Sequence, residues 1–149
     1  AGGGGTELPV QGRPVVNTTK QGMRAIALNR GEIRLQVAHG KNHDNIRNHP
    51  ALKGLTIPRT GRPGVIGTLV TKTAVIAGER DFFTTPEGKR GAMLRAYEKA
   101  TGKDAGAVFM PAGQTGTPMT YMLDGKQYIV VAIGGTGFEA EFIAFRLPN

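Results

Sequence analysis

A sequence repeat restricts what this chain can fold into more than any other feature. Residues 23–37 and 94–108 align with an offset of 71 positions. In each copy an apolar residue is followed by Arg-Ala, then by an apolar or aromatic residue and, five positions later, by Gly31 or Gly102. Helical periodicity does not predict a glycine at this matched position, whereas a strand, a tight turn and a returning strand do. The repeat therefore predicts two antiparallel hairpins, and residues 141–148 are a shorter echo of it.

The second copy overlaps the best helix candidate in the chain, residues 91–103. Met93, Leu94 and Tyr97 have the spacing of a helix face. The same residues also fit a strand, MLRAY, followed by a turn, EKATGK. The repeat favours the strand, so little helix is expected.

The dipeptide Asp124-Gly125 separates two apolar runs, residues 118–123 and 126–135. A type I′ turn needs positive φ at both central residues, which Asp and Gly tolerate best, so a hairpin is expected here. The returning run contains YIVVAI at 128–133, which has no clean apolar–polar alternation. This pattern predicts a strand that is buried on both faces.

Many short strands joined by glycine turns suit a chain of 149 residues with 23 glycines and 6% aromatic residues. Small antiparallel sheets that bury both faces stack radially as the blades of a β-propeller. The sequence therefore predicts an all-β fold of two to three antiparallel four-stranded blades. The 71-residue spacing exceeds the ~40 to 50 residues of a usual blade, and the excess is a polar, proline-containing insertion. The expected organisation of this single partial propeller, residues 1–149, is a first blade portion at 6–38, a long inter-blade loop at 39–64, a second blade at 65–112, and a C-terminal hairpin with a closing strand at 113–149.

Composition excludes several classes of function. The chain has no Cys, which removes disulfides, cysteine zinc sites and thiol chemistry, and no Ser, which removes Ser-His-Asp hydrolysis. The net charge is +8, but the basic residues are scattered without a block of five and there is no Trp. No nucleic-acid partner is therefore expected. Because no apolar run approaches about 18 residues, no membrane span is expected.

The segment 39–49 contains His39, His43, Asp44 and His49. Histidines four residues apart on a helix can bind zinc. The glycine, asparagines and proline in the same stretch argue against a helix. No metal site is therefore expected, and these residues are predicted to lie in a polar loop.

Two further groups resemble sites. Glu79, Asp81 and Glu87 could supply an acid/base pair, but nothing in the sequence fixes the separation that such chemistry needs, so a solvated edge is expected. The glycines of GGTGF at 134–138 imitate a phosphate loop, but no Lys-Ser/Thr and no helix signal follow. A tight connection between strands is expected there, and no catalytic residue is predicted.

Several long motifs together resemble the C-terminal blades of pyrroloquinoline quinone (PQQ) dependent dehydrogenases, the quinoprotein glucose and alcohol dehydrogenase group. The motifs are RNHPALKGLTIPRTGRPGVIGTLVTKTAVIAGE, MLRAYEKATGK, GTPMTYMLDGKQYIVVAIGG and FIAFRLP, and the resemblance covers residues 6–148. It implies an eight-bladed parent propeller, PQQ with a calcium ion on the propeller axis, a periplasmic or secreted setting, and oxidation of small sugars or alcohols.

The resemblance carries over few site residues. A chain of 149 residues is similar to only the last two to three blades, whereas the family's catalytic Asp and its basic quinone contact lie in earlier ones. The resemblance assigns only Val65, Ile66 and Gly67 to the cofactor-facing loop. The chain also departs from the family pattern, with Leu35 and Gly106 in place of an inter-blade Trp, Ala27 and Gly91 in place of Asp, Val65 in place of a Trp, and Thr136 in place of a His. We therefore expect no PQQ or calcium to be bound by this chain alone.

Three hypotheses follow. In the first, the chain is a structural, catalytically silent C-terminal portion of a PQQ-dependent sugar or alcohol dehydrogenase, an oxidoreductase, and its partner is the rest of the propeller. In the second, it is a free-standing β-rich binding or structural protein that closes as a homo-oligomer, because open blade faces and edges expose apolar surface. In the third, the remaining blades lie in a further part of the protein or in a separate chain.

Overall fold

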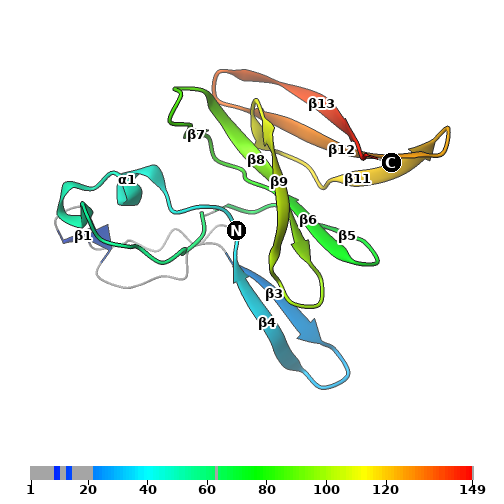
Figure 1. The fold of residues 1–149 in the computed structure, drawn as a ribbon, viewed down its shortest axis with the longest axis horizontal. Helices are drawn as coiled ribbons and strands as arrows, with labels where there is room; N and C mark the ends of the chain where they lie inside the picture. Colours follow the sequence, from blue (N-terminus) through cyan, green and yellow to red (C-terminus); the bar gives the residue numbers. More distant parts are fainter. Residues whose placement is uncertain (1–8, 11–12, 15–21, 63, 149) are drawn as a thin grey trace.

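The structure, a computed structural model, describes residues 9–10, 13–14, 22–62 and 64–148 (Figure 1). In chain order its elements are β1 (Pro9–Val10), β2 (Arg13–Pro14), β3 (Gly22–Ala27), β4 (Glu32–Ala38), α1 (Asp44–Arg47), the 3-10 turn η1 (Pro50–Leu52), β5 (Leu69–Val70), β6 (Ala74–Gly78), β7 (Phe83–Thr84), β8 (Arg90–Glu98), β9 (Asp104–Met110), β10 (Gly113–Gln114), β11 (Met119–Leu123), β12 (Lys126–Gly135) and β13 (Phe138–Arg146). The described residues are thus almost entirely strand and loop, as predicted. Among them, no helix has the length and apolar character needed to cross a membrane.

The two copies of the repeat form antiparallel hairpins with the same register. In the first, β3 and β4 pair Met23 with Val37, and in the second, β8 and β9 pair Leu94 with Val108. These are the residues that the 71-position offset matches. The segment 91–103 is therefore a strand and a turn, and the alternative helix is excluded.

The resemblance between the hairpins extends to their irregularities. Each ladder has a bulge directly after the matched alanine, Ala25 in the first hairpin and Ala96 in the second. Each turn closes on a glycine with positive φ, 68° at Gly31 and 71° at Gly102. Both glycine N–H groups donate to the carbonyl four residues earlier, at 2.8 Å. The repeat thus specifies turn, bulge and register together.

The central sheet is an antiparallel meander in the order β5-β6-β8-β9, and β7 pairs with the start of β8 beside β6. In the last sheet, β12 pairs with β10 and β11 along one edge and with β13 along the other. The predicted Asp124-Gly125 hairpin is present, with φ values of 49° and 72°. Gly134 and Gly135 of GGTGF end β12, and Gly137, with a φ of 77°, lies in the tight turn to β13, so a tight connection between strands is present as predicted.

The apolar core joins the central sheet to the last sheet. Its buried residues are Ile76, Ala92, Leu94, Met110, Ala112, Ile129, Val131 and Ile133. The prediction that β12 is buried on both faces is only half right, because Ile129, Val131 and Ile133 are buried while the alternate residues Val130 and Ala132 are half-buried. One neighbouring sheet covers one face of β12, and nothing in the described part of the chain covers the other to the same degree.

Gln114 joins the last sheet to the central sheet by hydrogen bonds. The Gly78 N–H donates to Gln114 Oε1 at 2.5 Å, and Gln114 Nε2 donates to the Gly67 carbonyl at 2.8 Å. The adjacent Gly113 lies so close that a Cβ there would be 1.8 Å from the backbone oxygen of Arg80. The contact between the sheets therefore requires glycine at position 113, because any side chain there would collide with the backbone.

Candidate functional site

The loop of residues 39–64 lies against the face of the central sheet that is turned away from the core. Leu94 and Ala96 of β8 contact the core. Because successive side chains of a strand point to opposite faces, Arg95 and Tyr97 lie on the other face. Hydrogen bonds join Tyr97 there to His39 and Arg59 of the loop. The loop, which carries α1 in Figure 1, is thus joined to a polar face of the sheet.

The expectation that this loop contains no helix is wrong at two short turns, α1 and η1. Asp44 in the single turn of α1 pairs with Arg47 at 3.0 Å, which stabilises that turn. Pro50 occupies the first turn of η1, and His49 Nδ1 accepts the Ala51 N–H at 3.2 Å as a cap. The glycine and proline that argue against a long helix lie on either side of α1, so a single turn fits between them.

His39 is fully buried and links the loop to the sheet. Its Nε2 lies 3.1 Å from the Gly78 carbonyl, and its Nδ1 lies 3.0 Å from the Tyr97 hydroxyl. A carbonyl can only accept, so Nε2 carries the hydrogen and Nδ1 accepts from Tyr97. The same hydroxyl accepts from Arg59 Nη2 at 3.0 Å. Every donor in this chain of bonds meets an acceptor when His39 is neutral.

Burial lowers the pKa of His39, and the positive charges of Arg95 and Arg59 act in the same direction. The hydrogen bond to the Gly78 carbonyl and the charge of Glu79 oppose this shift without cancelling it. Burial likewise raises the pKa of Tyr97, so its hydroxyl keeps its proton. The pair is therefore a neutral hydrogen-bonded link.

Glu79 does not lie on a solvated edge, which corrects the expectation for this residue. It is 2% exposed, and its Oε1 accepts from Arg95 Nε at 2.8 Å. Its side chain also packs against Gly40, where an added Cβ would lie 3.0 Å from Oε1. Asp81 is half-buried and Glu87 is exposed. Glu79 is thus half of a buried ion pair beneath the loop, and its carboxylate is engaged by Arg95.

Arg62 is the second buried cation of this face, at 2% exposure. Its Nη1 donates to the Phe82 carbonyl at 3.0 Å and its Nη2 donates to Asp44 at 2.7 Å, while its guanidinium lies over the Phe83 ring. Among the described residues, its Nε and the Nδ1 of His43 are buried without a hydrogen-bond partner. Arg62 ties the far limb of the loop to α1 and to β7.

The three histidines have separate surroundings. His39 is in the buried link, His43 precedes α1, and His49 caps η1. Within the residues that the structure describes, no group of three His, Asp, Glu or Cys side chains is placed to hold a metal ion.

Val65, Ile66 and Gly67, which the resemblance assigns to the cofactor-facing segment, follow the loop of residues 39–64 and precede β5. Val65 is 86% exposed, and its carbonyl accepts from Arg80 Nη1 at 3.4 Å. Ile66 faces the cavity between hairpin β3–β4 and the central sheet. Gly67 packs on Thr117, whose Oγ1 would lie 2.0 Å from a Cβ at that position.

This donor set does not fit PQQ as a complete site. PQQ carries three carboxylates, and groups of this kind are bound best by several cationic or N–H donors in concert. Val65, Ile66 and Gly67 offer apolar surface, and the bonded cation beside them is Arg80.

Sequence reasoning missed the network of His39, Arg59, Tyr97, Glu79 and Arg95. A signal was present in the repeat, because the second copy has Arg-Ala-Tyr where the first has Arg-Ala-Ile. A tyrosine in place of an isoleucine on a strand face indicates a hydrogen-bond partner opposite that face. The sequence gives no sign of which loop residues supply that partner.

Comparison with known proteins places the chain among quinoproteins. The family described as "Glucose/ethanol/alcohol dehydrogenase, beta-propeller domain", a PQQ family, matches residues 5–129. The chain is 36% identical over 103 residues to a probable quinate dehydrogenase (quinone) of Xanthomonas campestris pv. juglandis, covering 64% of this chain and 12% of that protein. It is 36% identical over 105 residues to quinoprotein glucose dehydrogenase A of Acinetobacter calcoaceticus, and the match covers 67% of this chain and 12% of that protein. It is 48% identical over 61 residues to the quinoprotein glucose dehydrogenase of Escherichia coli (strain K12), and the match covers 38% of this chain and 8% of that protein.

The chain thus spans about an eighth of the length of the first two relatives. No solved structure gives a significant match. The family match covers most of the chain, and it agrees with the all-β antiparallel sheets and with the register-matched hairpins. The chain therefore belongs to the glucose/ethanol/alcohol dehydrogenase β-propeller family of PQQ quinoproteins.

Proposed function

We propose that this chain supplies the C-terminal blades of a PQQ-dependent dehydrogenase that oxidises sugars or alcohols, and that it is catalytically silent alone. The observation that carries the proposal is the family match over residues 5–129. The register-matched hairpins support it, because a propeller repeats the same antiparallel strand unit from blade to blade. On the basis of the same family match, we also propose that the dehydrogenase holds a calcium ion beside the quinone and that it is periplasmic or secreted.

We expect the chain alone to be inactive because the cofactor site of such a dehydrogenase is divided among its blades. A cofactor site gathered on a propeller axis loses most of its contacts and its preorganisation when most blades are absent. Val65, Ile66 and Gly67 supply one wall and Arg80 one cation near it. The buried carboxylate of Glu79 is engaged by Arg95 beneath the loop and is not a free general base.

We expect no dye-linked oxidation of glucose or alcohols by the purified chain, even with PQQ and calcium added. The measurement is a titration with PQQ and calcium followed by a dye-reduction assay, with an intact quinoprotein glucose dehydrogenase as the positive control. Turnover that requires both additions would refute the silent role and show that a complete site assembles between copies of the chain.

A second candidate function is a free-standing β-rich binding or structural protein that acts by self-association. One observation favours it. Directly paired residues share a face of a sheet, and the face of the last sheet opposite the core carries Met119, Tyr121, Val130 and Phe142, of which Phe142 is 80% exposed. Tyr121 stacks on Tyr128 on the same face. Uncovered apolar surface of this kind marks an interface.

We expect the isolated chain to associate through this face of the last sheet. Light scattering at micromolar concentration should report a mass above the 15.8 kDa of one chain. The substitution Phe142→Lys should shift the population toward monomer because it places a charge in the apolar face. Lys72→Gln, an exposed change in the turn before β6, is the control. A monomeric wild-type chain would contradict this expectation.

A further inference from the structure

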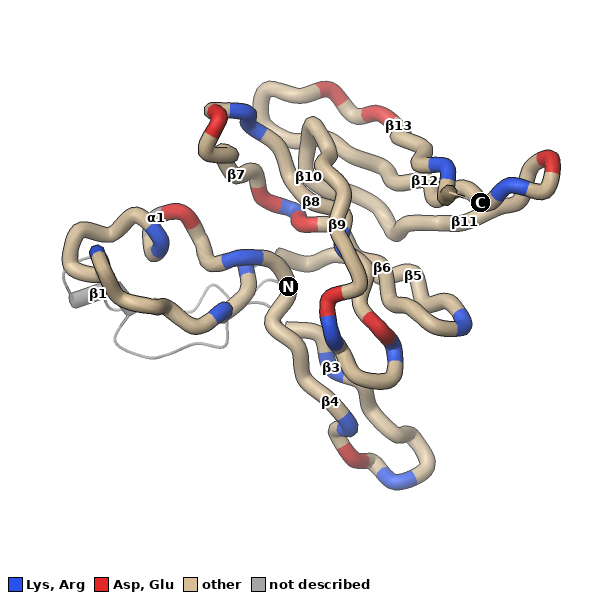
Figure 2. Tube along the Cα trace, in the orientation of Figure 1, with Lys and Arg blue, Asp and Glu red and all other residues tan. Residues whose placement is uncertain are grey.

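The loop of residues 39–64 concentrates positive charge. It contains five basic side chains, Lys41, Arg47, Lys53, Arg59 and Arg62, and one acidic side chain, Asp44, a net charge of +4 out of +8 for the whole chain. Figure 2 shows the same imbalance around α1. A sixth of the sequence thus carries half of its net charge.

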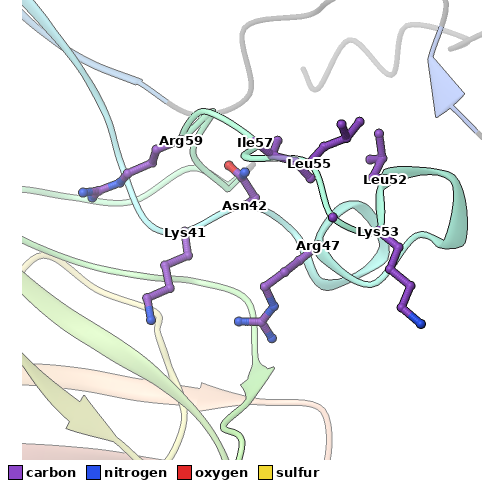
Figure 3. Close-up of a pocket in the computed structure, with 9 residues that line it drawn as sticks. Lys41, Asn42, Arg47, Leu52, Lys53, Leu55, Ile57 and Arg59 are labelled. Atoms are coloured by element: carbon purple, nitrogen blue, oxygen red, sulfur yellow. The ribbon is translucent and has the colours of Figure 1, made fainter.

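A pocket of about 490 Å³ lies within this loop. Its lining residues are Lys41, Asn42, Arg47, Leu52, Lys53, Gly54, Leu55, Ile57 and Arg59. Four of these nine are cationic and none is acidic. In Figure 3 the side chains of Lys41 and Arg47 project in the same direction, and those of Leu52, Leu55 and Ile57 lie on the other side of the pocket. The pocket therefore has a cationic side and an apolar side.

Hydrogen bonds hold the two limbs of the loop together around this pocket. Asn42 Nδ2 donates to the Pro58 carbonyl at 2.9 Å, and Asn42 Oδ1 accepts from the Thr60 N–H at 2.7 Å. Arg59 Nε donates to the Gly40 carbonyl at 2.6 Å. These hydrogen bonds within the chain fix the frame of the pocket, which reduces the ordering cost of binding.

The charge inside the pocket is only partly neutralised. Asp44 accepts from both Arg47 and Arg62, so one carboxylate serves two guanidinium groups. Arg59 pairs with Asp104 of β9. The ammonium groups of Lys41 and Lys53 have no hydrogen-bond or ion-pair partner in the part of the chain that the structure describes. Both cations are thus available to an anion, but in Figure 3 they lie at opposite ends of the pocket with Arg47 between them, so a single small anion meets only one of them.

The apolar side of the pocket is also available. Leu55 is 64% exposed, and Leu52 and Ile57 are half-buried beside it. We infer that this pocket binds a small amphiphilic anion, a phosphate or carboxylate joined to a short apolar chain. The anionic group lies with Lys41 and the neighbouring Arg47, whose side chains project in the same direction, and the apolar chain covers Leu52, Leu55 and Ile57.

The experiment uses hexyl phosphate as the probe and measures binding by titration calorimetry and by backbone amide shifts. Hexyl phosphate should bind at least about tenfold more tightly than inorganic phosphate, because part of its chain leaves water. Hexanol should not bind detectably. Vesicles that contain phosphatidylglycerol distinguish a lipid surface from a free ligand. We expect the protein to bind these vesicles no more tightly than it binds hexyl phosphate.

Variants separate the two halves of the pocket. Lys41→Gln should weaken the binding of hexyl phosphate about tenfold, since a charge-assisted contact is lost, whereas Lys53→Gln, at the other end of the pocket, should weaken it less. Leu55→Ala should reduce the preference for hexyl phosphate over inorganic phosphate without changing the affinity for inorganic phosphate. Lys72→Gln, outside the pocket, should change the dissociation constant less than about twofold. Unchanged thermal unfolding of each variant excludes loss of fold.

Three results would overturn the inference. They are no binding of hexyl phosphate at millimolar concentration, equal affinity for inorganic phosphate, and equal weakening by Lys72→Gln. Tighter binding to the vesicles would assign the pocket to a lipid surface instead. None of these outcomes depends on dehydrogenase activity, so the pocket is tested apart from the proposed function.

Discussion

Glu79→Ala is expected to lower the free energy of unfolding by about 3–5 kcal/mol, because it leaves the guanidinium of Arg95 buried without its partner. Arg95 is 7% exposed and lies 2.8 Å from Glu79. Removing one member of a buried pair strands an uncompensated charge away from water, and this costs far more than the pair contributes to stability. The carboxylate also packs against Gly40, so its loss loosens the start of the loop. Urea denaturation followed by circular dichroism measures the change.

Two further variants test the cause of this loss. Glu139→Ala, an exposed change on β13, should leave the free energy of unfolding within about 0.5 kcal/mol of the wild-type value. Replacing both partners, Glu79→Leu with Arg95→Met, should cost clearly less than Glu79→Ala, since no charge is then left unpaired. A Glu79→Ala protein within about 1 kcal/mol of wild type would show that the carboxylate is solvated after all.

His39→Ala is expected to lower the free energy of unfolding by about 2–4 kcal/mol. The substitution leaves the Gly78 carbonyl and the Tyr97 hydroxyl without their partner, and it opens a cavity at a fully buried position. His49→Ala is the matched control, because His49 lies at a partly exposed cap of η1 and should cost about 1 kcal/mol. Equal losses in the two variants would refute the role of His39 as the anchor of the loop.

The same histidine predicts how stability depends on pH. Burial lowers the pKa of His39 in the folded chain below its ordinary value of 6.5. As pH falls below 6.5, the unfolded chain binds a proton that the folded chain does not, so stability falls until pH reaches the folded pKa. Protonated His39 would also present a second donor to Tyr97, whose other neighbours, Arg59 and the Gly40 N–H, are donors too. A buried cation there would face the positive charges of Arg59 and Arg95 and the negative charge of Glu79.

The measurement compares urea midpoints of wild type and His39→Gln between about pH 7 and about pH 5. Glutamine keeps a donor and an acceptor but has no titrating group in this range, so its slope with pH should be shallower than that of wild type. Parallel slopes would assign the pH dependence to other groups.

Local sequence determined the hairpins of this protein. Gly31, Gly102 and the Asp124-Gly125 pair reach positive φ at little cost, and the apolar runs around them have few alternatives to pairing back. Turn chemistry acts over four or five residues, and for this reason the matched register of β3–β4 and β8–β9 follows from a 71-residue repeat. The family could be identified for the same reason, because its motifs are contiguous stretches.

Tertiary structure alone decided which polar residues are buried. Glu79 reads as a surface acid until the pairing of β6 with β8 brings Arg95 beside it. His39 reads as a loop residue until the chain returns to place it against Tyr97, 58 positions later. The half-covered face of β12 likewise depends on which sheets are its neighbours. Burial is a property of what packs on a residue from elsewhere in the chain, whereas turn and strand preferences are properties of the residue and its neighbours in sequence.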